Sequence, residues 1–189
     1  NKNQIQIIRT FLRSQRNGLR DETIFLLSVK SGLRSKEISL LSWNMVCKSD
    51  GTIDDYINLP NSSTKGNSGR IIPLHKDIKT NLKLMLLEHR GLFGFDINKS
   101  FIVRTERTPF TTSQTIVNMF QKWYGKLGLI GCSSHSGRRT FITETSKKIG
   151  SVGGSLRDIQ MLVGHSNLQT TQRYIESDSE SQRKVVDLI

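Results

Sequence analysis

Near the C-terminal end of the chain, Tyr174 stands nine residues after His165, in the stretch VGHSNLQTTQRY. The glycine directly before this histidine is typical of a helix end. We therefore expect a polar turn and a short second helix that returns Tyr174 to the side of His165. Upstream, SSHSGRRTF places His135 and Arg138 three residues apart, on one face of a predicted helix. SGLRSKEISLLSW places Arg34 at the start of another helix.

Together, these side chains are suited to holding a phosphodiester and attacking it. Arginine binds two phosphate oxygens with its planar fork and stays charged, so Arg34 and Arg138 could hold both non-bridging oxygens. His135 and His165 could donate to the same oxygens or move protons near neutral pH. Tyr174 is the candidate nucleophile. Because a phenol has a pKa of about 10, it needs a positive pocket to attack at neutral pH.

Each of these residues taken alone has a simpler interpretation. Arg34 or Arg138 could be a surface arginine or a contact to a phosphate backbone. His165 could be a helix-end residue, and Tyr174 could be a core tyrosine on an amphipathic helix. The chemical interpretation is favoured because the residues occur as a set.

Three further residues are candidates for supporting roles. Lys65, in the turn TKGNSG, could reach the minor groove of DNA and protonate a leaving 5′ oxygen, or be an exposed hairpin lysine. Glu37 could orient Arg34 through a salt bridge, or be an acidic residue placed for the helix dipole. We expect Arg139 to bind DNA. The remaining histidines, His75 and His89, are interpreted as ordinary surface or helix-end residues.

The composition is that of one folded, soluble domain with a polyanionic partner. The chain has 189 residues, 35 % of them hydrophobic and 23 % charged, which is enough for a single core. Lys and Arg number 28 against 16 Asp and Glu, for a net charge of +12. This excess favours nucleic acid as the partner, although a generic basic surface is the alternative. No apolar run approaches the roughly 18 residues of a membrane span, and no signal peptide opens the chain.

No motif indicates a metal or a cofactor, and we expect neither. Cys47 and Cys132 are far apart and match no metal spacing, so we expect buried packing residues in a reducing compartment. H-E-x-x-H, C-x-x-C and nucleotide-binding glycine loops are all missing from the sequence. GSVGGS at 150–155 is interpreted as a flexible loop.

Periodicity predicts an α+β fold that is mainly helical, with a small antiparallel sheet at one edge. Two strands, 52–59 and 69–74, are expected to be joined by the polar turn NSSTKGNSG. Ser35 is expected to cap a short helix. Apolar residues at helical spacing, with glycines as stops, predict helices around Ile8, Leu27, Leu82 and Phe120, and at about 135–149, 155–163, 167–175 and 179–187.

The ordered set resembles the tyrosine recombinase (phage integrase) family, over about residues 20–176. GLRSKEISLLSW is similar to the first arginine box of that family, SHSGRRTF to the second and VGHSNLQTTQRY to the third. The resemblance implies cleavage without metal, through a 3′-phosphotyrosyl link and a free 5′ hydroxyl. It implies Tyr174 as the nucleophile, Arg34, Arg138 and His165 as phosphate ligands, Lys65 as the general acid and His135 as an aid to proton transfer.

Two features depart from the family pattern. Gly137 stands where a bulky apolar residue is usual, which we expect to loosen the packing behind Arg138. The family's N-terminal helical domain is absent from these residues, so we expect a single catalytic domain over 1–189, either excised or of a short invertase-like type.

The resemblance also implies partners and leaves alternatives open. It implies double-stranded DNA at a specific site, and a homotetramer on paired DNA that is a monomer or weak oligomer when free. The tail at about 177–189 would be exchanged between protomers. A bacterial or phage-encoded protein of the cytoplasm, associated with the nucleoid, is expected. The alternatives are a type IB topoisomerase, which His135 disfavours because Lys or Arg is more usual there, and a non-catalytic integrase-derived DNA-binding regulator.

Overall fold

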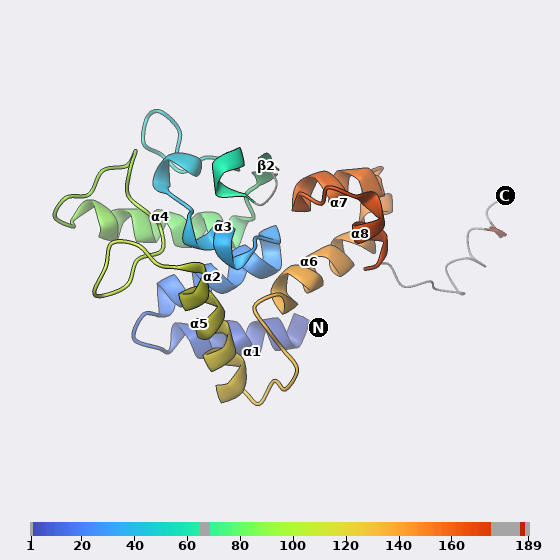
Figure 1. Ribbon diagram of the computed structural model, residues 1–189, viewed down its shortest axis with the longest axis horizontal. Coiled ribbons are helices and arrows are strands. Elements are labelled where there is room, and N and C mark those ends of the chain that lie inside the picture. The colour runs from blue at the N-terminus through green and yellow to red at the C-terminus, as the bar shows by residue number, and fades with distance from the viewer. Residues whose placement is uncertain (1, 65–68, 175–185, 188–189) are drawn as a thin grey trace.

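The computed structural model describes residues 2–64, 69–174 and 186–187. Helices dominate (Figure 1), and in these residues one hairpin of two short strands accompanies them. The mainly helical α+β fold predicted from the sequence is confirmed. The elements are, in chain order, α1 (Lys2–Arg13), α2 (Gly18–Ser31), α3 (Ser35–Ser39), η1 (Trp43–Met45), β1 (Tyr56–Leu59), η2 (Asn61–Ser63), β2 (Arg70–Pro73), α4 (Lys76–Arg90), α5 (Ser113–Lys126), α6 (Ser136–Ser146), η3 (Ile149–Val152), α7 (Leu156–Val163) and α8 (Leu168–Gln172).

Helix α2 is the centre of the molecule. Figure 1 shows it between α1 and α5 on one side and α4 on the other, and it packs against α1, α3, α4 and α6. Its residues from Asp21 to Val29 are all buried, as expected of a helix surrounded by others. Gly32 ends it in the left-handed conformation, with φ at 64°, which glycine adopts without a steric penalty.

The C-terminal helices form a smaller unit with a core of its own. Ile142 of α6 packs with Ile159 and Val163 of α7, and all three side chains are fully buried. Tyr174 packs against this cluster just beyond α8. Figure 1 shows α7 and α8 beside the far end of α6, opposite the long connection between α4 and α5. The unit therefore carries the predicted second and third boxes together.

The predicted hairpin is present, with shorter strands than expected. β1 and β2 pair antiparallel, with Ile57 opposite Ile72 and Leu59 opposite Arg70. Because side chains alternate across a strand, Arg70 points to the same inner face as the buried Ile72, whereas Ile71 points outward. Strand β2 contacts α7 on that inner side. The hairpin thus presents Arg70 to the C-terminal unit.

Several local expectations are wrong. Arg34, not Ser35, occupies the N-cap position of α3, and its backbone N–H donates to the side chain of Glu37. The segment 150–155 contains part of η3, and its end caps α7 through a reciprocal bond between Ser155 and Asp158, so it is not simply a loop. Cys132 is exposed rather than buried, and Cys47 is half-buried.

The histidines outside the motifs differ from each other. His75 caps α4, as a helix-end residue should, and accepts the backbone N–H of Asp77. His89 lies in the last turn of α4, as a helix-end residue should, but it is buried rather than on the surface. Its Nδ1 accepts the indole N–H of Trp43 at 3.1 Å. Burial, with some help from Arg104, lowers the pKa of His89 to about 4. His89 is therefore a neutral core residue.

Most of the helix predicted at 179–187, and most of the tail at 177–189, lie outside the described residues. In the part that is described, no helix is both long and apolar enough to cross a bilayer.

Candidate active site

The C-terminal end of α7 binds three arginines from three different elements. The last carbonyls of a helix have no partner within the helix, and they carry the negative end of its dipole. Here each of three successive carbonyls accepts one guanidinium N–H. Leu162 accepts from Nε of Arg70 at 2.8 Å, Val163 from Nη2 of Arg138 at 2.7 Å, and Gly164 from Nη2 of Arg34 at 3.2 Å.

Arg34 and Arg138, predicted to act together, are brought together at this end of α7. Arg34 comes from the N-cap position of α3, and Arg138 comes from the first turn of α6. Nη1 of Arg138 also donates to the carbonyl of Gly32, the residue that ends α2. Burial, followed by the nearby charge of Arg34, lowers the pKa of Arg138 to about 9. Arg138 therefore remains a cation at neutral pH.

Glu37 lies at the centre of the arginine cluster. Its Oε1 accepts from Nη1 of Arg34 at 3.0 Å and from Nη1 of Arg70 at 2.9 Å. Its Oε2 accepts from Nη2 of Arg70 at 3.1 Å and from the backbone N–H of Arg34 at 2.8 Å. Glu37 thus fills both of the roles weighed from the sequence, since it pairs with Arg34 and is also an acidic residue in the first turn of α3.

The charge state of Glu37 follows from these contacts. Its side chain is 1 % exposed, and burial opposes ionisation most strongly. The hydrogen bonds and charges of Arg70 and Arg34 outweigh this effect, so the pKa of Glu37 is below its ordinary value. A buried carboxylate with two arginine partners is the arrangement that makes such burial tolerable.

His165 and Tyr174 lie side by side, as predicted. Their rings are stacked, with centroids 6.1 Å apart and planes inclined by 19°. Gly164, in the left-handed conformation with φ at 62°, ends α7 and turns the chain into His165. Thr171, fully buried in α8, bonds through Oγ1 to Nδ1 of His165 at 2.9 Å. The bond occupies one ring nitrogen and leaves Nε2 for a ligand.

His165 is neutral at neutral pH. Burial, and then the positive charges of Arg138, Arg34 and Arg70, lower its pKa from 6.5 to about 4. When a neutral imidazole accepts a hydrogen bond from the Thr171 hydroxyl on Nδ1, its own proton is on Nε2. His165 can then donate one hydrogen bond to a phosphate oxygen without adding charge.

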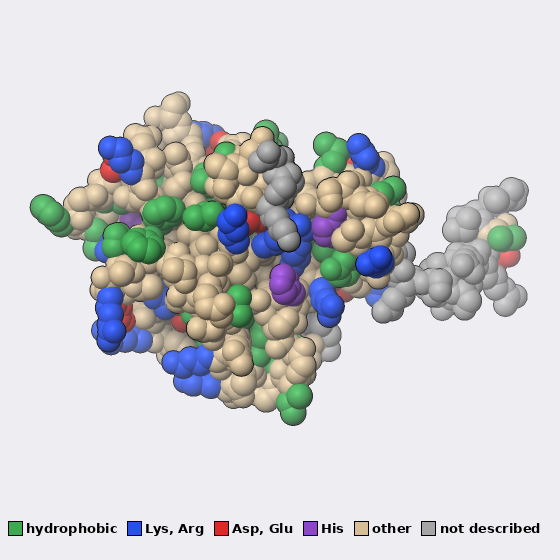
Figure 2. Space-filling view, viewed as in Figure 1, with side chains coloured by type: hydrophobic (Ala, Val, Ile, Leu, Met, Phe, Trp, Pro, Cys, Tyr) green, Lys and Arg blue, Asp and Glu red, His purple; other side chains and the backbone are tan. Residues whose placement is uncertain are grey.

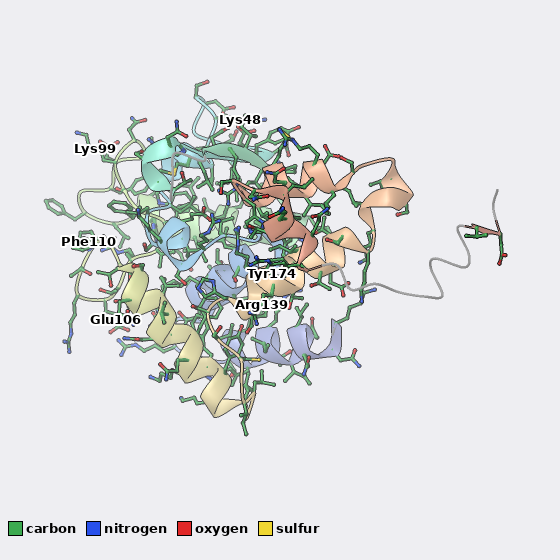
Figure 3. The ribbon with its side chains drawn as sticks, turned by 45° about the vertical axis from the view of Figure 1, so that its right-hand side comes forward. Lys48, Lys99, Glu106, Phe110, Arg139 and Tyr174 are labelled. Atoms are coloured by element: carbon green, nitrogen blue, oxygen red, sulfur yellow. The ribbon has the colours of Figure 1, made fainter. Side chains whose placement is uncertain are left out.

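The other predicted residues are placed differently. His135 occupies the N-cap position of α6 and is exposed, and its side chain makes no capping hydrogen bond. Arg139 is exposed next to the buried Arg138. Figure 3 labels Tyr174 and Arg139 in the middle of the molecule, well apart from Lys48 and Lys99. Figure 2 shows histidine and basic side chains near the middle of one face. Lys65 lies outside the described residues.

Arg70 and Thr171 were missed in the sequence. Both had a usable signal. Arg70 alternates with Ile72 along β2, which puts it on the inner face of the strand. Thr171 stands six residues after His165, with Tyr174 three residues further on, so one short helix could return both.

The expectation that Gly137 loosens the packing behind Arg138 is wrong. A β-carbon on Gly137 would lie 2.4 Å from Oγ of Ser28 and 3.0 Å from its Cβ. The glycine therefore allows α6 to approach α2 closely. This close approach brings Arg138 within reach of the carbonyl of Gly32.

The chain is similar to known recombinases. A tyrosine recombinase XerC of Actinobacillus pleuropneumoniae is 33 % identical over 124 residues, which is 65 % of this chain and 38 % of that protein. A tyrosine recombinase XerA of Pyrococcus horikoshii is 27 % identical over 123 residues, or 40 % of its length. The chain thus spans about two fifths of the curated relatives that it matches.

Solved structures have the same fold. The Tn1549 transposon integrase in complex with transposon right end DNA superposes with a TM-score of 0.74 at 18 % identity, over 100 % of this chain and 65 % of that one. A crystal structure of XerA recombinase also gives 0.74, at 19 % identity, over 100 % of this chain and 63 % of its own. The sequence model of the phage integrase family matches residues 1–181. The chain belongs to the phage integrase family and has the fold of a tyrosine recombinase catalytic domain.

Proposed function

We propose that the chain is the catalytic domain of a site-specific DNA recombinase that cleaves and rejoins DNA through Tyr174. One observation carries the proposal. Arg34 and Arg138 both bind the end of α7, the helix that leads directly into His165 and Tyr174. The two cations are therefore anchored to the helix end that leads into the segment with the nucleophile, which favours a fixed geometry for attack on a phosphodiester.

In the proposed reaction, Oη of Tyr174 attacks the scissile phosphorus while the bond to the 5′ oxygen breaks. The products are a 3′-phosphotyrosyl link and a free 5′ hydroxyl. Because the phosphate passes to the tyrosine and not to water, the hydroxyl can reverse the step and rejoin the strand. Arg34 and Arg138 neutralise the non-bridging oxygens, and His165 donates to one of them from Nε2. The family resemblance assigns Lys65 as the donor of the proton to the leaving oxygen, and His135 as an aid to proton transfer from the tyrosine.

The proposed substrate is double-stranded DNA at a specific site. The surplus of 28 basic over 16 acidic residues supports a polyanionic partner. Among the structures of similar fold are XerH site-specific recombinase bound to difH substrate and Tn1549 integrase bound to transposon DNA. By the same resemblance we propose that four copies assemble on paired DNA.

The test uses a library of DNA duplexes with randomised sequence around a nick. After attack close to the nick, the short fragment with the new 5′ hydroxyl dissociates, so the covalent adduct cannot reverse. We expect adducts that survive denaturing gels, form in excess EDTA and are enriched in one sequence. Tyr174→Phe should still bind DNA, since the substitution removes no charge. It should form no adduct, since the attacking oxygen is missing.

The same experiment separates the alternatives. A recombinase should also join two duplexes that carry the selected sequence. A type IB topoisomerase would relax supercoiled plasmids with and without that sequence at equal rates. A non-catalytic regulator would enrich a sequence without any adduct, and this result would contradict the proposal.

A further inference from the structure

We propose that Arg70 is a positioning residue for this reaction, which acts on Arg34 through Glu37 and on His165 through the end of α7. The inference rests on the proposed function, because it concerns the site at which cleavage would occur. Arg70 itself would not touch the phosphate. Arg34 is more exposed than Arg70. Arg138 is as deeply buried as Arg70, but its two terminal nitrogens donate to backbone carbonyls rather than to a carboxylate.

All three nitrogens of the Arg70 guanidinium donate to protein acceptors. Nη1 and Nη2 form a two-bond fork with the carboxylate of Glu37, and Nε donates to the carbonyl of Leu162. Within the described part of the chain, Arg34 donates from its two terminal nitrogens only, Nη1 to Glu37 and Nη2 to the carbonyl of Gly164. The Arg70 side chain is 6 % exposed, against 25 % for Arg34. Arg34 can therefore still receive a ligand, whereas Arg70 is already engaged.

The first route from Arg70 to the site runs through Glu37. Arg34 and Arg70 share one carboxylate oxygen of Glu37, so the fork with Arg70 fixes the orientation of the group that holds Arg34. A bidentate arginine–carboxylate pair imposes geometry as well as charge. Without Arg70, the full negative charge of Glu37 would face Arg34 and compete with the phosphate for it.

The second route runs through the end of α7. A β-carbon on Gly164 would lie 2.8 Å from Nη1 of Arg70 and 3.2 Å from Cζ, so the guanidinium packs directly on this glycine. The next residue is His165. Arg70 thus supports the turn that positions His165. The stacked ring of His165 in turn contacts Tyr174.

The decisive variant is Arg70→Lys. It keeps the positive charge and loses the fork, because an ammonium cannot bind a carboxylate with two parallel bonds from a planar group. If only charge mattered, lysine would suffice. If position matters, cleavage by folded molecules should fall about 10- to 100-fold, the scale expected for a misplacement of roughly 1 Å.

The measurement is the rate constant of adduct formation on the selected nicked duplex, with DNA in excess and saturating. The final amplitude counts the active molecules, so the rate constant reports on folded protein alone. We expect a lower rate constant for Arg70→Lys and for Arg70→Gln, with the Kd for DNA within about threefold of the original. Arg90→Lys is the matched control, since Arg90 also donates to a backbone carbonyl, that of Gly51, from an exposed position. Its rate constant should not change.

A double-mutant cycle tests the route through Glu37. Glu37→Gln should lower the rate constant. The rate constant of the double variant Glu37→Gln, Arg70→Lys should lie within about threefold of that of the slower single variant. Multiplied effects would overturn the inference, as would a normal rate constant for Arg70→Lys. If neither Arg70 variant is folded at the assay temperature, Arg70 holds the fold rather than the site, and the inference is also wrong. Absence of an adduct with the unsubstituted protein would overturn the proposed function together with this inference.

Discussion

Gly137 of α6 lies against Ser28 of α2 so closely that a β-carbon on the glycine would be 2.4 Å from the serine hydroxyl oxygen. That hydroxyl is buried and makes no hydrogen bond to any described residue. The contact therefore serves close packing of the two helices. Its consequence is the position of Arg138, one residue further along α6.

Gly137→Ala should destabilise the protein by about 1–3 kcal/mol, the usual cost of an added methyl in a packed interior. Ser28→Ala should be close to neutral, because it removes an unpaired buried hydroxyl, and it should recover part of the loss when combined with Gly137→Ala. Gly125→Ala is the control, since Gly125 lies in α5 with open space around it. We expect Gly125→Ala to be stabilising by about 0.5–1 kcal/mol. Urea unfolding measures all four variants, and an unchanged stability of Gly137→Ala would contradict the packing argument.

His165 should act as a neutral hydrogen-bond donor rather than as a cation. His165→Gln, which keeps a donor at a similar reach, should retain adduct formation within about tenfold, whereas His165→Phe should lose about 100-fold. The measurement is the single-turnover rate constant at pH 7.5 on the nicked duplex. Equal losses in the two variants would show that the donor on Nε2 does not matter.

Acid should destabilise the protein in the window between pH 6.5 and about 4. The folded state keeps His89 and His165 neutral down to a pKa of about 4, whereas unfolded histidines take up protons near 6.5. The unfolded state then binds more protons, so the free energy of unfolding falls as the pH falls through this window. His89→Gln should flatten the slope, and combining it with His165→Gln should flatten it further. A free energy of unfolding that stays constant from pH 6.5 to 5 would contradict both assignments.

Arg138 and Arg139 are neighbours in sequence, but substitution of Arg138 should mainly affect cleavage and substitution of Arg139 should mainly affect DNA binding. Arg139 is exposed, so Arg139→Ala should weaken DNA binding and lower the slope of log Kd against log salt by about 1. Its rate constant of cleavage at saturating DNA should not change. Arg138→Ala should lower that rate constant by about 100-fold or more. Filter binding over a salt series and single-turnover cleavage measure the two effects, and a catalytic defect in Arg139→Ala would contradict the division of roles.

The sequence was sufficient to predict what local spacing controls. The Gly-His helix end and the return of Tyr174 to His165 follow from one short motif. The convergence of Arg34 with Arg138 was expected because their motifs occur together as an ordered set. Leu162, Val163 and Gly164 also carry a signal, because helix-terminal carbonyls need partners. That three arginines would bind these carbonyls could not be predicted, since the arginines lie 25 to 130 residues away along the chain.

The errors come from contacts that spacing does not encode. Gly137 was expected to leave a gap, but the partner helix closes that space with Ser28. His89 has helical spacing like its neighbours, and only its contact with Trp43 shows that it is buried. Arg70 resembled an ordinary strand residue until Glu37 was found opposite it. In each case tertiary packing decided the role of the residue.

The central claim is that Tyr174 makes the covalent bond to DNA, and mass spectrometry of the trapped adduct tests it most directly. After nuclease and protease digestion, one peptide should carry a nucleotide 3′-phosphate on the oxygen of Tyr174. Tyr124, which is buried in the core and whose pKa burial raises, is the internal control and should be unmodified. A modified peptide that contains Tyr174 in the original protein, and no adduct in Tyr174→Phe, is the result we predict. A phosphate attached to any other residue would contradict the account.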